Sequence, residues 1–191
     1  RQYSGTAGRI ENCQIGVFLS YASRLGQALI DRRLYLPESW AEDRMRRKEA
    51  HVPEDVCFAT KPALAREMIA QARNAGVPCA WVLGDALYGS DKSLRVMLEE
   101  RRKPHVLAVR SNEKFMVGAF KMQTAAQMAD AVPPKEWRRL PAGEGAKGLR
   151  LYDWARLRIE RLQDPDGPFE HWLLVRRNCQ DKDDRAYYVV F

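Results

Sequence analysis

The sequence predicts an α/β fold: a mixed β-sheet flanked by helices, followed by a β-rich part. Residues 60–110 alternate helix and strand with short connections, which is typical of a mostly parallel sheet covered by helices. Two strand-like segments before residue 37 would add antiparallel strands. After Val117 the pattern changes to Gly and Pro turns between strand-like runs. We therefore expect one part over residues 1–116 and a β-rich part over residues 117–191.

The first two strands are expected to form a hairpin. Residues 12–21 alternate and then become apolar, residues 28–36 are again strand-like, and Pro37 ends the second run. Only a short polar connection separates the two runs, which favours an antiparallel pair. Residues 38–58 are polar and contain Pro53, so a loop with some helix is expected there.

A helix is predicted from Thr60 to Gly76. Thr is a good N-cap, Pro62 stands in the first turn where its missing N–H costs nothing, and Gly is frequent just after a helix. Leu64, Met68 and Ala72 recur at helical spacing, and Ala65 and Ile69 widen the stripe. One face of this helix should therefore be buried.

The next elements are a strand, a helix and a second strand. Residues 79–83 form a continuous apolar run, which favours a central strand covered on both faces. A helix is expected from Ser90 or Asp91 to Pro104, packing through Leu94, Met97 and Leu98. Residues 105–109 read as another buried strand. In the β-rich part we expect a short helix at 124–131, strands at 149–159, 171–177 and 186–191, and a turn at 164–168.

The composition argues against a membrane-spanning or disulfide-rich protein. No apolar stretch is long enough to span a bilayer, and no signal peptide opens the sequence. The four cysteines are widely spaced, which favours reduced thiols and a cytoplasmic location over a disulfide framework. The net charge of +7 is a modest bias toward a polyanionic partner. Because Arg1 is not a Met and residues 187–191 read as a strand, we expect an internal segment of a longer protein.

Asp85 is the candidate catalytic residue. It follows an apolar strand, and functional groups of α/β sheets gather at the carboxyl ends of strands. Gly84 and Gly89 allow close backbone approach and a turn into the next helix. A carboxylate held there is a hard oxygen ligand suited to Mg²⁺ or Mn²⁺. The alternative is that Asp85 only caps the turn or the following helix.

The surroundings of Asp85 resemble a known family. Residues 85–89 (DALYG) are similar to the D-x-x-Y/F pattern around the second aspartate of many DDE transposases. Residues 8–17, 31–37, 75–78 and 81–89, with 151–155 and 171–177, together resemble the IS701 family of IS4-like bacterial insertion-sequence transposases. The ordered set, more than any single piece, makes this resemblance specific.

The resemblance implies a fold and a reaction. It implies an RNase H-like sheet with a β-rich subdomain inserted before the last catalytic helix. It also implies three carboxylates that bind two Mg²⁺ (or Mn²⁺) ions, which activate a nucleophile and stabilise the leaving oxygen in DNA cleavage and strand transfer. Asp85 matches the second Asp. The other two carboxylates, the first strand and the last catalytic helix are expected outside this chain, so residues 1–116 and 117–191 would be partial.

The implied partner is double-stranded DNA, as transposon ends and target, bound by a nucleoid-associated homodimer in a synaptic complex. Tyr88 is expected either to pack under the metal site or to touch a base. Arg110, Lys114, Arg138 and Arg139 are candidates for phosphate contacts, with a solvated surface as the alternative.

Other polar and aromatic residues are assigned structural roles. Asp31 and Glu113 are expected on solvated turns or edges, and the three histidines lack metal-ligand spacing. Trp137, Trp154 and Trp172 are expected in the core rather than as platforms for base stacking.

Two functions remain open from the sequence. The first is a fragment of a metal-dependent DDE transposase, inactive by itself without the other carboxylates. The second is a truncated, non-catalytic DNA-binding or assembly module derived from such an enzyme. A hydrolase-like α/β domain is disfavoured because no Ser-His-Asp signature is present.

Overall fold

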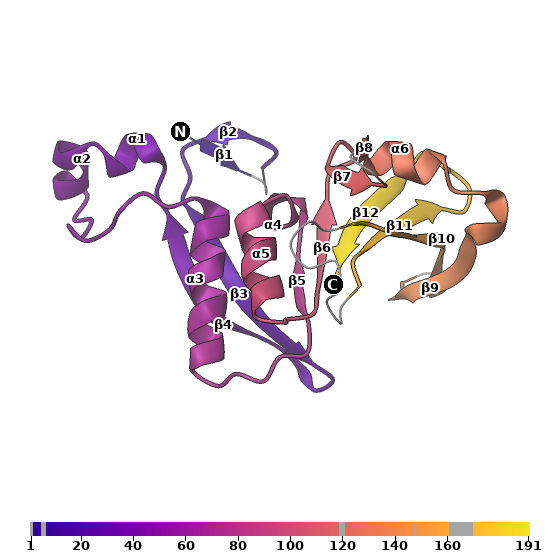
Figure 1. Ribbon diagram of the computed structural model, residues 1–191. Coiled ribbons are helices and arrows are strands. Elements are labelled where there is room, and N and C mark those ends of the chain that lie inside the picture. Colours follow the sequence, from indigo (N-terminus) through magenta and orange to yellow (C-terminus); the bar gives the residue numbers. More distant parts are fainter. Residues whose placement is uncertain (1, 5–6, 119–120, 147, 161–169) are drawn as a thin grey trace. The chain divides into compact units, whose positions relative to one another are not determined.

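The computed structural model describes residues 2–4, 7–118, 121–146, 148–160 and 170–191. The chain forms two compact units, Arg1–Pro78 and Cys79–Phe191 (Figure 1). No helix of the described residues is long and apolar enough to cross a membrane. The four cysteines form no disulfide with one another.

The first unit contains two hairpins and a covering helix. β1 (Gln2–Ser4) pairs with β2 (Arg9–Glu11), and the predicted hairpin is formed by β3 (Ile15–Ser23) and β4 (Gly26–Tyr35). The polar stretch that follows forms the short helices α1 (Glu38–Ala41) and α2 (Arg44–Glu49). Helix α3 (Lys61–Asn74) then packs on β3 and β4.

Helix α3 confirms the predicted boundaries and stripe. The Thr60 side chain accepts a hydrogen bond from the Ala63 amide at 3.2 Å, so Thr60 is the N-cap. Ala65, Met68 and Ile69 are the buried residues of the helix. Val17 of β3 is buried in the same unit.

The second unit is a six-stranded mixed sheet in the order β5-β6-β12-β11-β10-β9. Strands β5 (Val82–Gly84) and β6 (His105–Val109) are parallel, and every other neighbouring pair is antiparallel. The other strands of this sheet are β9 (Arg138–Gly145), β10 (Gly148–Arg158), β11 (Trp172–Asn178) and β12 (Arg185–Val190). A separate hairpin joins β7 (Lys114–Val117) to β8 (Lys121–Thr124).

In the described part of the chain, short helical segments accompany this sheet. They are α4 (Ala86–Gly89), α5 (Lys92–Glu100), α6 (Ala125–Asp130) and the 3₁₀ turn η1 (Pro134–Glu136). Leu94 and Leu98 of α5 are buried, as predicted, and Asp91 caps that helix. The predicted helix near 124–131 is α6, which begins with a capping box of Thr124 and Gln127. The predicted turn at 164–168 lies outside the described residues.

The prediction that residues 79–83 form a central strand was wrong. β5 is an edge strand of three residues, and Trp81 and Leu83 are 53% and 73% exposed. The continuous apolar run led to a wrong prediction because a local pattern does not show how many neighbouring strands a strand will pair with. The neighbouring strand β6 lies between β5 and β12, and its residues alternate between buried and half-buried.

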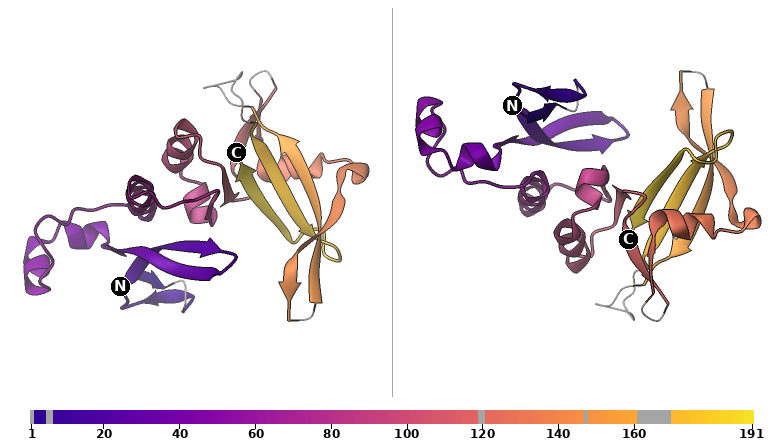
Figure 2. Two further views of the ribbon diagram at one scale, coloured as in Figure 1. Left: turned by 90° about the horizontal axis from the view of Figure 1, so that it is seen from below. Right: turned by 90° about the horizontal axis from the view of Figure 1, so that it is seen from above.

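The two faces of the six-stranded sheet differ. One face, called the core face below, holds Leu173, Val175, Tyr187 and Val189, which pack with residues of α6. The two panels of Figure 2 view the molecule from opposite sides, and in both of them α6 lies across the strands of this sheet. The opposite face, called the open face, holds half-buried residues that alternate with the buried ones along β11 and β12.

Strands β9 to β12 lie after the predicted division at residue 116, yet they share one sheet with β5 and β6. The architecture is therefore a mixed α/β sheet flanked by helices, and it is compatible with an RNase H-like fold. The division into residues 1–116 and an inserted subdomain 117–191 stays a prediction.

The core face also holds a group of titratable side chains at its β6 end. His105 and His171 are buried, and both rings lie beside the ring of Phe191. His171 Nε2 is 3.6 Å from Glu99 Oε1, and Arg95 pairs with Glu113 at 2.7 Å. The solvated role predicted for Glu113 was therefore wrong, because Arg95 draws its side chain into a partly buried pair, 14% exposed.

His105 should make stability depend on pH. Burial lowers the pKa of His105; the Lys103 carbonyl and Glu99 oppose the shift, while His171 and Arg95 reinforce it. The unfolded state then binds a proton more readily than the folded state, so stability falls as pH drops below about 6.5. The free energy of unfolding is measured in urea at pH 7 and at pH 5. Its decrease from pH 7 to pH 5 should be smaller for His105→Leu than for wild type, by about 1 kcal/mol.

The control for this measurement is His51→Asn. His51 is exposed, and Asn tolerates its positive φ of 53°. This variant should keep the pH dependence of wild type. Equal pH dependence of His105→Leu and wild type would contradict a role for His105.

Candidate active site

Asp85 stands at the carboxyl end of β5, as predicted, and its side chain is exposed. It is the N-cap of α4: its Oδ1 atom accepts a hydrogen bond from the Leu87 amide at 2.8 Å. Its carbonyl oxygen accepts hydrogen bonds from the amides of Tyr88 and Gly89. The capping role proposed as an alternative is thus present, and it uses one carboxylate oxygen. The geometry leaves the second oxygen available to a ligand.

Gly89 fixes the position of α4 on the sheet. A Cβ atom at Gly89 would lie 1.8 Å from the carbonyl oxygen of Ala108 in β6. The glycine was predicted to allow a turn into the next helix, but its observed function is this close contact. Because Asp85 caps the same turn, the contact also determines where its carboxylate lies.

Tyr88 packs beside Gly84 and is half-buried. Burial raises the pKa of the Tyr88 phenol, and the nearby charge of Asp85 raises it further. The phenol therefore stays protonated and neutral next to the carboxylate. Of the two positions predicted for Tyr88, packing beside Asp85 fits this geometry, whereas contact with a base is untested.

Arg110 lies at the same edge of the sheet as Asp85. In the parallel pair, Gly84 is level with Leu107, and Arg110 is the first residue after β6. Both Arg110 and Lys114, at the start of β7, are exposed. The structure therefore places a cation at the sheet edge that carries the carboxylate.

Asp85 is not surrounded by other ligands in the described part of the chain. No group of three or more His, Cys, Asp or Glu side chains there could hold a metal ion. Asp31 instead pairs with Arg33 at 2.6 Å on β4. A single carboxylate does not make a Mg²⁺ site, because this ion keeps its waters unless several oxygens converge.

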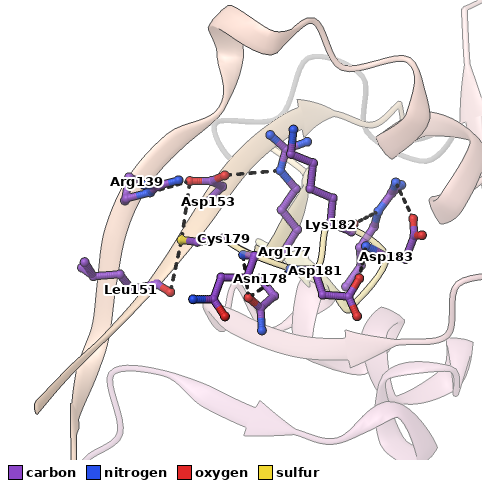
Figure 3. A network of polar contacts seen from close by, with 11 residues as sticks. Arg139, Leu151, Asp153, Arg177, Asn178, Cys179, Asp181, Lys182 and Asp183 are labelled. Atoms are coloured by element: carbon purple, nitrogen blue, oxygen red, sulfur yellow. Dashed lines mark hydrogen bonds and ion pairs between the residues drawn. The ribbon is translucent and has the colours of Figure 1, made fainter. Parts of the chain in front are cut away.

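Arg138 and Arg139 are successive residues of β9, so their side chains lie on opposite faces of the sheet. Arg138 stands opposite Trp154 on the open face. Arg139 Nε donates to Asp153 Oδ1 at 3.0 Å, and Arg177 Nε is 3.5 Å from Asp153 Oδ2 (Figure 3). The pKa of Asp153 is lowered, first by the hydrogen bond from Arg139. Arg139 is thus partly neutralised by an ion pair that the sequence did not predict.

The comparison with protein families agrees with this geometry. A mixed sheet with an exposed carboxylate after a parallel strand is the arrangement expected of a nuclease of the DDE type. The family model of the DDE superfamily endonuclease matches residues 1–156, so the chain belongs to this family. The match includes Asp85 and the whole sheet edge around it. A search of curated proteins found no match.

Gly89→Ala should destabilise the protein. The added methyl group cannot be accommodated unless α4 or β6 moves, and overpacking of this kind costs about 1–3 kcal/mol. The measurement is the free energy of unfolding in urea. The control is Gly16→Ala, whose methyl group would meet only the tip of the exposed Phe18 ring. A cost no larger than that of the control would contradict the close contact.

Asp153→Asn should also destabilise, by about 1–3 kcal/mol at neutral pH, because two arginines lose a carboxylate that is only 11% exposed. The lowered pKa means that this stabilisation is present above about pH 4 and is lost as pH falls through the folded-state value. The unfolding free energies of variant and wild type should therefore differ at pH 7, and the difference should shrink as the pH falls below about 4.

The control for Asp153→Asn is Asp183→Asn. Asp183 lies 3.7 Å from Arg185, but its side chain is 96% exposed, so the change should have little effect. If Asp153→Asn is no more harmful than this control, the Asp153 cluster does not stabilise the sheet.

Proposed function

We propose that the chain is the catalytic-core segment of a DDE transposase of the IS701 type. In this proposal Asp85 is one of the carboxylates that bind the divalent metal ions of DNA cleavage and strand transfer. The single observation that supports it best is the position of Asp85. The carboxylate is exposed at the carboxyl end of β5, and its hydrogen bond to the Leu87 amide occupies only one oxygen.

The proposal assigns two tasks to the residues around Asp85. The hydrogen bond from the Leu87 amide holds one oxygen of the carboxylate, and the other oxygen would bind the metal ion. Arg110 and Lys114 would contact DNA phosphates at the same edge, which would add affinity without sequence preference. Bound divalent ions would supply charge stabilisation at the scissile phosphate. DNA affinity from such contacts should fall steeply as salt rises.

Further carboxylates must join Asp85 for this chemistry, and we place them outside the described residues. The exposed side chains of Trp81 and Leu83 support a neighbour for β5, since edge strands with large apolar side chains readily accept another strand. We also infer that such a strand would complete an RNase H-like sheet, that Mg²⁺ is the ion, and that two protomers hold the DNA ends.

The second candidate is a non-catalytic DNA-binding or assembly module. The absence of a metal-binding group among the described residues favours it for the chain by itself. The two candidates differ in one measurement, because only the enzyme hydrolyses DNA in a metal-dependent way.

The variant Asp85→Asn separates them in the protein produced from the whole gene. Asn is as good an N-cap as Asp, so the variant keeps the turn of α4 and loses only the anionic oxygen. We expect Mg²⁺-dependent cleavage of DNA bearing the element's ends to fall by at least about a thousandfold, about 4 kcal/mol in activation free energy.

The matched control is Asp91→Asn. Asp91 is also an N-cap aspartate, whose Oδ1 accepts a hydrogen bond from the Leu94 amide at 2.6 Å. Rates are compared at equal DNA occupancy. Cleavage by Asp85→Asn at the rate of the control would show that Asp85 is a cap and not a metal ligand.

A further inference from the structure

The open face of the six-stranded sheet combines cations with aromatic rings. Among the described residues it carries the arginines Arg138, Arg156, Arg158 and Arg176 and the large rings of Tyr152, Trp154, Trp172 and Tyr188. The strand register places these side chains on one surface. Arg138 and Arg176 flank Trp154 on the two neighbouring strands, and Arg158 stands opposite Trp172.

The rings of this face are not in the core, which corrects the prediction for Trp154 and Trp172. Both are half-buried, as are Tyr152 and Tyr188, while the residues between them along the strands are buried. Only Trp137 packs against the core, with the guanidinium of Arg177 3.7 Å from its ring centre. Several large rings that stay partly exposed on one surface form a patch of the kind that marks an interaction site.

Two of the cations on this face lie over aromatic rings. The guanidinium of Arg156 lies 4.7 Å from the ring centre of Trp172, and that of Arg176 lies 4.3 Å from that of Tyr152. A guanidinium that lies over a ring still has N–H groups that can donate to phosphate oxygens.

In the described part of the chain, carboxylates do not pair with these arginines. On β10, β11 and β12 no Asp or Glu stands on this face, and no ion pair of the described residues involves these four arginines. On the core face the opposite holds, since Asp153 pairs with both Arg139 and Arg177. The open face therefore complements a polyanion.

The rings indicate which polyanion. Trp154 and Tyr188 stack at 6.4 Å with an angle of 29° between their planes, which gives the face a continuous aromatic patch beside the arginines. Paired bases of a duplex show only their edges, whereas unpaired bases can stack on aromatic rings and on guanidinium planes. An acidic peptide would use the cations but not the rings.

We propose that the open face of the sheet binds an unpaired strand of nucleic acid, with bases stacked on Trp154, Tyr188 and Trp172 and phosphates held by Arg156, Arg158 and Arg176. The site is distinct from Asp85 and needs no metal ion. The proposal goes beyond duplex cleavage, because it assigns to the same molecule a surface for strands that are no longer base-paired.

The experiment measures binding of fluorescein-labelled oligothymidylate by fluorescence anisotropy, in EDTA and at about 0.1 M salt. Removing metal ions makes the outcome independent of any cleavage at Asp85. The double variant Arg156→Gln/Arg176→Gln should bind at least about tenfold more weakly than wild type. The matched control, Lys92→Gln/Arg101→Gln, removes the same charge from exposed positions of α5 and its C-cap and should weaken binding only slightly. Equal losses in both variants would overturn the proposal.

A second readout tests stacking without relying on one variant. Bases that stack on indole rings quench their fluorescence, so oligothymidylate should quench wild type. The conservative variant Trp154→Phe/Trp172→Phe should lose most of this quenching, although Trp40, Trp81 and Trp137 remain. Unchanged quenching would overturn the proposed rings.

Competing ligands decide the class of partner. Oligouridylate that competes as well as or better than oligothymidylate supports the same face with RNA as the strand, and weaker competition supports DNA. Competition by a duplex of equal charge, or by polyglutamate, that matches oligothymidylate would overturn recognition of unpaired bases.

Discussion

The contact between Gly89 and the backbone of β6 is the constraint on which the candidate active site depends. It allows α4 to approach the sheet so closely that the Ala108 carbonyl occupies the space of a side chain. The parallel pairing of β5 with β6 fixes the level of Asp85, and the contact fixes the direction in which the chain leaves the strand. A helix cap and a ligand position can then coexist at one aspartate, because capping uses a single oxygen.

The sheet built on this edge has two chemically different faces. The core face buries apolar residues under α6 and brings together His105, His171 and Glu99 around Phe191. On the open face the rings are half-buried, and no ion pair of the described residues involves Arg138, Arg156, Arg158 or Arg176. One sheet thus supports a sheet-edge carboxylate, a titratable core cluster and a cationic aromatic surface.

Much of this arrangement could be predicted from the sequence. The hairpin of β3 and β4, the capped helix α3, the parallel pair of β5 and β6, and Asp85 at its carboxyl edge all follow local patterns. Those patterns are short-range: turns, caps and helical spacing act over a few residues. The family match over residues 1–156 confirms the class that the resemblance implied, while the IS701 assignment stays a proposal.

What could not be predicted depends on long-range pairing. The edge position of β5 and the exposure of Trp154 and Trp172 follow from the strand order, which no local pattern encodes. The pairs Arg95–Glu113 and Arg139–Asp153 join residues 18 and 14 positions apart. The Gly89 contact likewise depends on the position of α4 against β6. The sequence therefore suggested that the glycine permits a turn, whereas the structure shows that it permits a close packing contact.

The central claim is that Asp85 binds a divalent ion, and Mn²⁺ binding tests it most directly. Electron paramagnetic resonance of the protein from the whole gene, bound to DNA ends, reports the number of Mn²⁺ ions held and their affinity. We expect that Asp85→Asn loses or weakens at least one bound Mn²⁺, whereas Asp91→Asn does not. Identical Mn²⁺ binding by wild type and Asp85→Asn would contradict it.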